Sequence, residues 1–241
     1  MQIATRDGVA TERERDVYVE EGHAHTAHLL GRHGEESDGP EAFLVEFRPN
    51  PGHYIKPHFH RVAQFQVIVG GEGRLGKKRL RPGTFHFADA WTPYGPIVAS
   101  DESRGIDFYT LRAFSRPGIW HMPGSKDKMQ QRAGRNIAIE PHELPRPVTG
   151  VEQQTLIEPH PDGLAALLLQ LAPNQQTTGP SPNGSAGQYY LVTEGSLHHD
   201  GTVLPSGSLI FVSAEDDPAT VTAGANGADV FVLQCPVEST A

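Results

Sequence analysis

Short apolar runs separated by glycine, proline and asparagine recur along the whole chain of 241 residues. The runs are rich in β-branched, aromatic and leucine side chains, as β-strands are. Several are apolar on both faces, which strands become when they close into a barrel or lie under a second sheet. Gly occurs 26 times and Pro 20 times, many of them in short turns. The pattern predicts an all-β protein with frequent chain reversals.

This pattern occurs twice, at a constant offset between the two copies. The aligned segments, which overlay without a gap and with glycines at the same turns, are AFLVEFRPN (42–50) with ALLLQLAPN (166–174), QFQVIVGGEG (64–73) with QYYLVTEGSL (188–197), and RPGTFHFADA (81–90) with PSGSLIFVSA (205–214). IDFYTLRAF (106–114) and DVFVLQC (229–235) end the two copies. Such register over about fifty positions indicates a duplicated domain.

The duplication divides the chain into three parts. Residues 1–120 are predicted to form an N-terminal barrel and residues 151–241 a C-terminal barrel. The segment 121–150 between them is rich in proline, glycine and charge, so we expect a linker. Within it, SKDKMQQRAG predicts a short helix with Ser125 as the N-cap and Gly134 just past the end.

Composition restricts the partners of the chain. The formal net charge is -9, and no stripe of Lys or Arg occurs, so we expect neither nucleic acid nor an anionic membrane as a partner. The polar N-terminus is no secretory signal and no apolar run approaches the ~20 residues of a membrane span, so the expected location is the cytoplasm by default. The single cysteine, Cys235, lies in an apolar run and is expected to be a buried small hydrophobe.

The segment PHFHRVAQFQ (57–66) carries the clearest chemistry. Residues i and i+2 of a strand share a face, so His58 and His60 point the same way, and Gln64 has the same parity. If that face lines a barrel, two imidazoles and an amide oxygen converge, a donor set that suits iron, zinc, manganese, nickel or copper. The alternative is a pair of surface histidines.

The spacing around this pair also carries a family resemblance. Gly52, His58, His60, Gln64 and Gly71 give G-x5-H-x-H-x3-Q-x6-G, which resembles the first motif of the cupin superfamily with Gln in place of Glu. With the duplication, the chain resembles a bicupin over roughly 40–115 and 164–235. The resemblance implies two tandem double-stranded β-helix (jelly-roll) barrels, one divalent transition metal and a homodimer.

The second cupin motif is degenerate. From Gly83, the positions of its proline, glycine and histidine hold Asp89, Trp91 and Tyr94, so Tyr94 stands where the resemblance implies the fourth metal ligand. His86 is the candidate replacement, either as a ligand or as a catalytic group, and otherwise is a core or rim histidine. His53 is a weaker candidate ligand.

The second copy lacks the metal motif altogether. Pro182 and Gly184 replace the two histidines, and Gln188 alone remains. We therefore expect a metal-free, structural C-terminal barrel. Because this glutamine persists without histidines, Gln64 is either a ligand or a packing hydrogen-bond partner.

Other side chains are candidates for binding and catalysis near the barrel mouth. Tyr94 is a candidate acid or base, or packs; Asp89 is a candidate base, or caps a turn. Trp91 and Tyr94 are candidate substrate contacts. Arg112 and Tyr109 have opposite parity in one strand, and an inward Arg112 would bind a substrate carboxylate.

Two further groups of histidines stand outside the motif. GHAHTAHLLGRH (22–33) is either a second metal site or a solvated histidine-rich edge. His198 and His199 precede a hairpin turn signal and are expected to be exposed.

Three functions follow from the candidate site. The first is a metal-dependent enzyme that abstracts a proton from a small organic molecule, as a lyase or isomerase, because a neutral Gln ligand leaves the ion a strong Lewis acid. The second is a metal-dependent dioxygenase, common among bicupins. The third is a non-catalytic bicupin that binds a small ligand or a metal. A seed-storage-like role is disfavoured by the short length.

Overall fold

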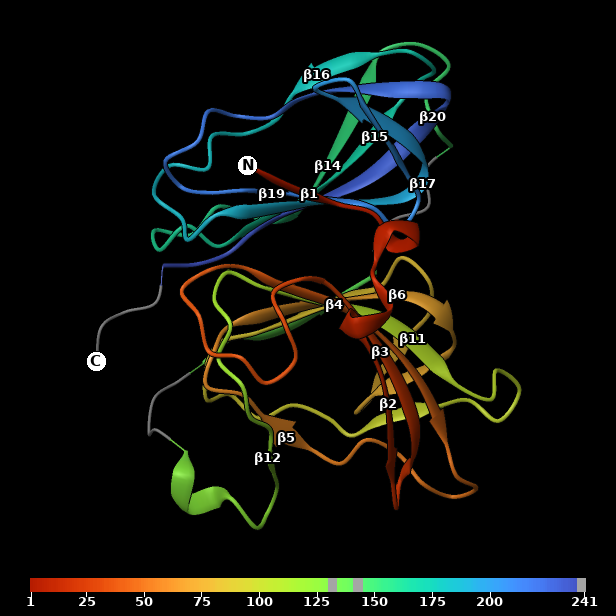
Figure 1. Ribbon diagram of the computed structural model, residues 1–241, viewed down its shortest axis with the longest axis vertical. Coiled ribbons are helices and arrows are strands. Elements are labelled where there is room, and N and C mark those ends of the chain that lie inside the picture. The colour runs from red at the N-terminus through yellow and green to blue at the C-terminus, as the bar shows by residue number, and fades with distance from the viewer. Residues whose placement is uncertain (130–133, 141–144, 238–241) are drawn as a thin grey trace. The chain divides into compact units, whose positions relative to one another are not determined.

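The computed structural model describes residues 1–129, 134–140 and 145–237, and its strands confirm the all-β class (Figure 1). The chain forms two compact units, one of Val9–Glu140 and one of Met1–Gly8 with Pro141–Ala241. The helical elements of the described residues are short 3-10 turns at Arg6–Gly8, Thr11–Arg13 and Lys126–Lys128.

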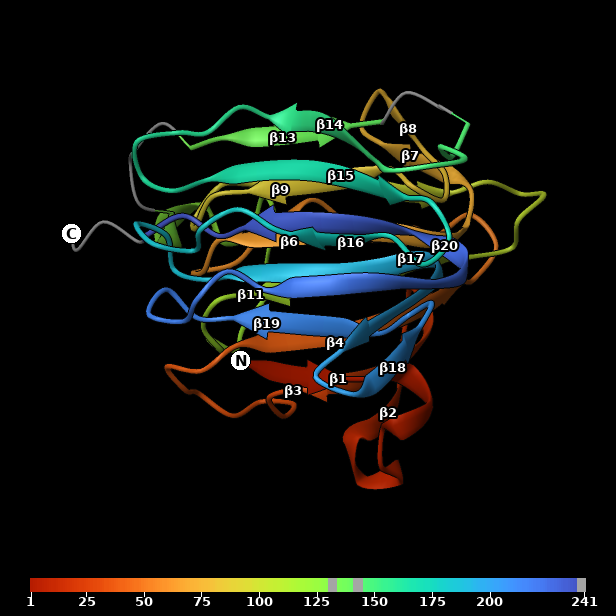
Figure 2. The same cartoon turned by 90° about the horizontal axis from the view of Figure 1, so that it is seen from above.

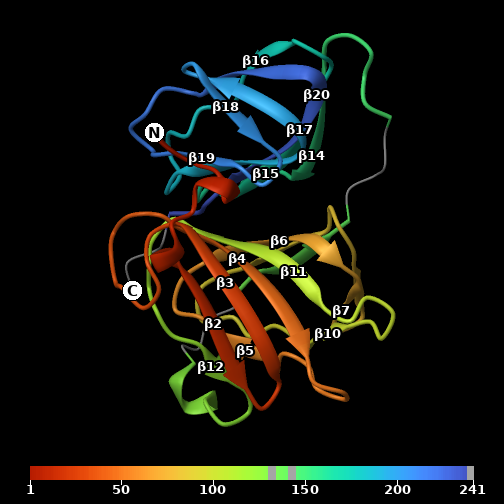
Figure 3. The same ribbon diagram turned by 45° about the vertical axis from the view of Figure 1, so that its right-hand side comes forward.

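The N-terminal unit is built on an antiparallel sheet with the order β13-β9-β6-β11-β4-β3-β2, most of which is seen in Figure 3. Its strands are β2 (Glu14–Val19), β3 (Gly22–Leu30), β4 (Glu41–Pro49), β6 (Gln64–Gly71), β9 (Phe85–Ala88), β11 (Ile106–Arg112) and β13 (Asn136–Ile139). Two smaller sheets complete the unit: β10 (Ile97–Ala99), β7 (Gly73–Leu75) and β8 (Lys78–Leu80) form one, and β12 (Trp120–His121) and β5 (His58–Phe59) form the other.

The C-terminal unit has a sheet with the order β1-β19-β17-β20-β15-β14, and Figure 2 shows its long central strands side by side. β16 and β18 pair with β20 and β17. The strands are β1 (Gln2–Ala4), β14 (Val151–Ile157), β15 (Ala165–Leu171), β16 (Gln176–Thr178), β17 (Gln188–His199), β18 (Thr202–Pro205), β19 (Leu209–Val212) and β20 (Thr220–Gln234). Their inward side chains form an apolar core that includes Leu169, Val192, Leu204, Ile210 and Val232.

The boundaries of the two units differ from the 1–120, 121–150 and 151–241 drawn from the sequence. Gln2–Ala4 pairs with β19 of the C-terminal unit, and the Met1 amine lies 2.8 Å from the Asp216 carboxylate. Asn136–Ile139, placed in the linker, pairs with β9 of the N-terminal unit. Both strands are short and pair with a sheet edge, whose unpaired N–H and C=O groups they satisfy.

Two local predictions need correction. The helix over 125–134 is only a 3-10 turn at Lys126–Lys128, and Ser125 makes no side-chain cap; residues 130–133 lie outside the described residues. His199 is buried rather than exposed, and its Nδ1 hydrogen-bonds the Thr220 carbonyl, whereas His198 is exposed.

Cys235 is buried, as predicted. None of the helices within the described part of the chain is long and apolar enough to cross a membrane.

Candidate functional site

Strand β5 and the loop that follows β9 hold His58 and Tyr94 against each other. The backbone N–H of His58 donates to the Tyr94 carbonyl and that of Tyr94 to the His58 carbonyl, each at 3.0 Å. Both residues are buried, at 3% and 4% exposure. Two-residue backbone pairing therefore fixes the distance between the motif histidine and the tyrosine that stands at the fourth-ligand position.

Backbone carbonyls set the tautomers of the histidine pair. His58 Nδ1 lies 2.7 Å from the Lys56 carbonyl, and His60 Nδ1 lies 2.7 Å from the Gly118 carbonyl. A carbonyl only accepts, so both Nδ1 atoms donate and both Nε2 atoms carry lone pairs. Arg112 Nη2 also lies 3.2 Å from His60 Nδ1, but the shorter contact with the carbonyl decides the tautomer, so this second contact is not a hydrogen bond. The rings are 5.2 Å apart. Histidines that bind metals are oriented in the same way, by donation from the other ring nitrogen.

A chain of hydrogen bonds runs from the pair into the barrel. Tyr94 Oη lies 2.8 Å from His58 Nε2, and Gln64 Nε2 donates to Tyr94 Oη at 2.6 Å. Gln64 Oε1 accepts from Arg112 Nε at 3.0 Å and from Arg112 Nη2 at 2.8 Å. The predicted pair of His58 and Gln64 is thus brought together, but through Tyr94 and with the amide oxygen directed at Arg112.

Arg112 is held by a buried carboxylate that the sequence analysis did not single out. Arg112 Nη1 donates to Glu41 Oε2 at 2.8 Å, and the two side chains are only 6% and 4% exposed. Burial acts to raise the pKa of Glu41, but the nearby His28 and the Arg112 charge keep that pKa below its ordinary value. Arg112 therefore points inward, which was one of the two orientations considered for it. Its guanidinium is already paired with a carboxylate of the protein itself.

Burial keeps the site neutral apart from this ion pair. It lowers the pKa of His58 and of His86 to about 4, and lowers that of His60 well below its ordinary range, with the Arg112 charge adding to the effect on His60. Burial also raises the pKa of Tyr94. Near neutral pH, the imidazoles are uncharged and the phenol keeps its proton.

The side chains of His86 and Asp89 are both engaged by other residues of the protein. The His86 ring lies 4.6 Å from that of Tyr94, but its Nδ1 and Nε2 face the amide oxygens of Gln66 and Asn136 at 3.2 and 3.0 Å. The Asp89 carboxylate is bound by the backbone N–H, Nε and Nη2 of Arg135 at 2.7–2.9 Å. It therefore joins β9 to the start of β13.

The segment after β11 also reaches the site, and its strand β12 crosses the predicted boundary at residue 120, so His121 was expected in the linker. Trp120 and His121 pair with Phe59 and His58 in β12 and β5. The Trp120 ring lies 5.7 Å from both Phe59 and Trp91, so these three aromatic side chains pack against one another. His121 is exposed, with its ring 5.9 Å from that of His58. The sequence signal that could have pointed to this segment is the aromatic-histidine pair in IWHM (119–122), which is similar to that in HFH (58–60).

The donor atoms only partly fit a divalent metal. His58 and His60 have the orientation of ligands, but Gln64 Oε1 and both nitrogens of His86 face other side chains, and Tyr94 is a neutral phenol. In the described part of the chain, no group of three or more His, Cys, Asp or Glu side chains is placed to hold one ion. Two neutral donors beside a guanidinium do not make a resident metal site.

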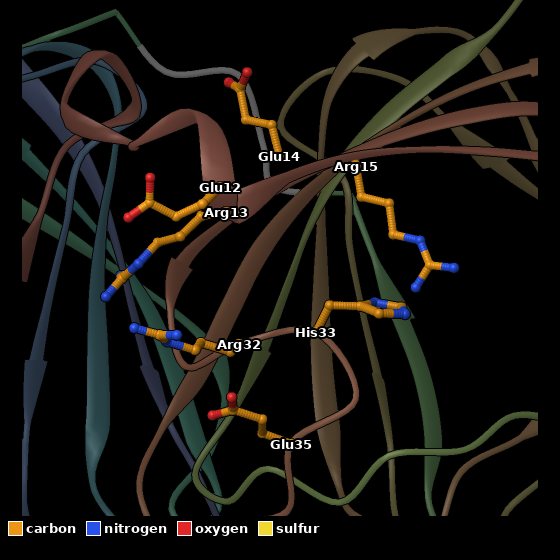
Figure 4. Close-up of a pocket in the computed structure, with 7 residues that line it drawn as sticks. All are labelled: Glu12, Arg13, Glu14, Arg15, Arg32, His33 and Glu35. Atoms are coloured by element: carbon orange, nitrogen blue, oxygen red, sulfur yellow. The ribbon is translucent and has the colours of Figure 1, made fainter.

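Two histidines of the 22–33 cluster and a charged cavity lie elsewhere in the N-terminal unit, whereas His28 of that cluster is buried, with its Nε2 3.8 Å from the Glu41 carboxylate. His23 and His25 hydrogen-bond the same oxygen of Asp16, at 2.7 and 3.1 Å, on partly exposed strands, which fits a histidine-rich edge. The cavity, of about 280 Å³, is drawn in Figure 4. Its lining carries three arginines, three glutamates and a histidine: Glu12, Arg13, Glu14, Arg15, Arg32, His33 and Glu35.

Solved structures show what this architecture is. No family model matches the sequence, and no curated protein matches it. The nickel(II) complex of the bacterial pirin YhhW from Escherichia coli has a TM-score of 0.59, with 11% identity over 98% of this chain and 99% of that one. Oxalate decarboxylase from Lactobacillus farciminis, as a formate complex, has a TM-score of 0.61, with 13% identity over 99% and 87%. Quercetin 2,3-dioxygenase from Acinetobacter baumannii has 0.56, with 14% over 94% and 78%.

These likenesses define the fold. The chain shares its fold with these proteins, which confirms the predicted all-β jelly-roll architecture. Identities of this size carry no activity, substrate or metal over to this chain.

Proposed function

We propose that the N-terminal barrel acts on a small anionic or enolisable organic molecule by proton abstraction, as a lyase or isomerase. The observation that carries the proposal is the state of His60. Its Nδ1 donates to the Gly118 carbonyl, so Nε2 presents a lone pair, and the residue is half-buried, with its ring 6.3 Å from that of Tyr94. His60 is therefore the candidate base.

The electrostatics favour an anion over a cation at this base. The Arg112 guanidinium lies 3.2 Å from His60 Nδ1 and lowers the pKa of both motif histidines, although burial is the larger cause. The same field stabilises negative charge that develops on a bound molecule, such as an enolate. A base with a lowered pKa abstracts only acidic protons, so the substrate class is one with an activated C–H.

The sequence predicted a divalent metal for this reaction, and similar folds include a nickel(II) complex. A metal, if bound, would be held by the Nε2 atoms of His58 and His60 and would polarise a substrate oxygen. The remaining donors do not support it, so the proposed proton transfer is written for His60 alone. The predicted homodimer and cytoplasmic location stay predictions.

Proton abstraction can be measured without knowing the product. Wild-type protein, with and without a chelator, would be incubated in D2O with a panel of small carbonyl compounds and carboxylates, and ¹H NMR would record the loss of C–H signals. We expect chelator-resistant exchange for an activated class, at least 100-fold slower in His60→Ala. His198→Ala, an exposed histidine of the other unit, is the control.

A second function is favoured by the closed hydrogen-bond chain. Because the polar atoms of Tyr94, Gln64 and Arg112 already have protein partners, the network has the character of a structural hydrogen-bond network as much as of a reactive site. Saturable binding of a panel member without any exchange would support a non-catalytic cupin. Consumption of dioxygen by the iron- or nickel-loaded protein would instead support the dioxygenase alternative.

A further inference from the structure

We infer that the Arg112–Glu41 ion pair turns the motif-one site of this barrel from a metal site into a hydrogen-bonded one, by fixing the direction of the Gln64 amide. The inference needs only the geometry of the site and stands apart from the proposed reaction. It explains why a nearly complete cupin metal motif is present without a matching set of donors.

The first step is the orientation of Gln64. A guanidinium has five N–H donors and no acceptor, so only the carbonyl oxygen of the amide can face it. Arg112 Nε and Nη2 donate to Gln64 Oε1 and use both of its lone pairs, while Glu41 holds Nη1 and so keeps the guanidinium in place. The oxygen that would bind a metal is therefore occupied.

The second step passes this direction on to His58. With its oxygen held by Arg112, Gln64 must direct its NH2 group at Tyr94 Oη, 2.6 Å away. Tyr94 accepts this hydrogen bond, and its single proton is then donated to His58 Nε2 at 2.8 Å. Of the three predicted donors, Gln64 Oε1 and His58 Nε2 already accept hydrogen bonds, and the third, His60, lies beside the guanidinium.

Two single substitutions should reverse this arrangement. In Gln64→Glu, the second carboxylate oxygen replaces an N–H donor with an acceptor, so Tyr94 donates to the new carboxylate and releases His58 Nε2. The site then holds two histidines and a carboxylate, a recurrent metal-binding triad. In Tyr94→Phe, the hydroxyl that covers His58 Nε2 is removed without any change of charge.

The test is calorimetric titration of the full-length, metal-stripped protein with nickel(II) and with manganese(II). We expect both Gln64→Glu and Tyr94→Phe to bind nickel(II) at least tenfold more tightly than wild type. The double variant Gln64→Glu/His58→Ala should return to the wild-type value. Tyr94→Phe keeps the test decisive if two carboxylates around Arg112 prevent Gln64→Glu from folding, which circular dichroism would show.

The opposite results would overturn the inference. One is stoichiometric, tight nickel(II) or manganese(II) binding by wild type that is lost in His58→Ala and weakened in Tyr94→Phe, because the tyrosine would then be a ligand. The other is no gain of affinity in either folded variant. Neither result depends on proton exchange, so failure of the inference and failure of the proposed reaction are separate outcomes.

Discussion

The two barrels fill equivalent interior positions with different chemistry. Gln64 and Gln188 begin equivalent strands, and both are buried. In the N-terminal barrel, Gln64 bonds Arg112, which pairs across strands with Glu41. In the C-terminal barrel, the residue opposite Gln188 is Gln234, and the residue opposite that is Ala165. The ion pair of one copy is thus an amide and a methyl group in the other.

This comparison shows that the neighbours of the glutamine, rather than the glutamine itself, decide its role. Gln188 Nε2 donates to the Pro180 carbonyl at 3.0 Å, and its Oε1 is buried without a partner. The residues around it form a core of leucine, valine and alanine. The interior of the C-terminal barrel is therefore mainly apolar. We propose that this barrel has a structural role.

The largest difference between the two barrels should appear in their stability at acidic pH. His58 and His86 have pKa values of about 4, below the ordinary 6.5, because burial disfavours their charged forms. The unfolded chain takes up these protons at a higher pH, so their contribution to stability is complete above about 6.5 and is lost as the pH falls towards 4. The slope is roughly 1.4 kcal/mol per pH unit for each histidine.

Both tryptophans lie in the N-terminal unit, so their fluorescence reports its unfolding, while peptide-resolved hydrogen exchange follows the C-terminal unit. We expect the N-terminal unit to lose several kcal/mol between pH 6.5 and 4, and His86→Gln to flatten this loss. A tryptophan signal with the same urea midpoint at pH 7 and pH 4.5 would contradict the neutral, buried histidines.

The second-largest effect should come from breaking the Arg112–Glu41 ion pair. Glu41→Ala leaves Arg112 buried without its carboxylate, so we expect the free energy of unfolding of the N-terminal unit to fall by about 3–5 kcal/mol. Urea unfolding monitored by tryptophan fluorescence measures it. Glu72→Ala is the matched control, because it breaks an exposed pair with Arg79 and should cost less than about 1 kcal/mol. Equal losses would mean that the buried pair has no special weight.

The repeat explains why the fold was predictable from the sequence. The glycines and apolar runs stand in register in both copies, and these local signals are enough to place most of the strands. β1 and β13 were missed because three or four residues of weak pattern form strands only when a sheet edge is offered to them. The predicted N-cap at Ser125 was wrong: its backbone is not in the extended conformation of an N-cap, and its side chain makes no capping hydrogen bond.

The site was predictable only in part. Spacing and parity brought out His58, His60, Gln64 and Arg112, and the cupin resemblance brought out Tyr94. The structure gathers them in one network. The sequence could not give the direction of the Gln64 amide, because that depends on Glu41, which is distant in the chain and carries no motif. Asp89 was a reasonable candidate base until its pairing with Arg135, a contact that only the chain path reveals.

Removing a tyrosine hydroxyl should have opposite effects in the two barrels. Tyr94→Phe removes the hydroxyl that pairs with the Gln64 NH2 group and with His58 Nε2, so we expect a loss of about 1–3 kcal/mol. Tyr190 Oη is buried without a partner, so Tyr190→Phe should be neutral or stabilising by up to about 1 kcal/mol. Thermal unfolding of both variants compares them. A clear loss in Tyr190→Phe would indicate that its hydroxyl has a bound partner in solution.

The smallest effect concerns the strand that the N-terminus lends to the C-terminal sheet. The Met1 amine, together with Ser213, lowers the pKa of Asp216 to about 2, so this stabilisation is present above about 3.8 and is lost as the pH falls towards 2. The pair is partly exposed, so Asp216→Asn should leave global stability nearly unchanged, by less than about 1 kcal/mol. Its effect should be local, as faster hydrogen exchange in residues 2–4. Asp217→Asn, an exposed neighbour, is the control, and equal exchange in both variants would show that pairing with β19 alone holds the strand.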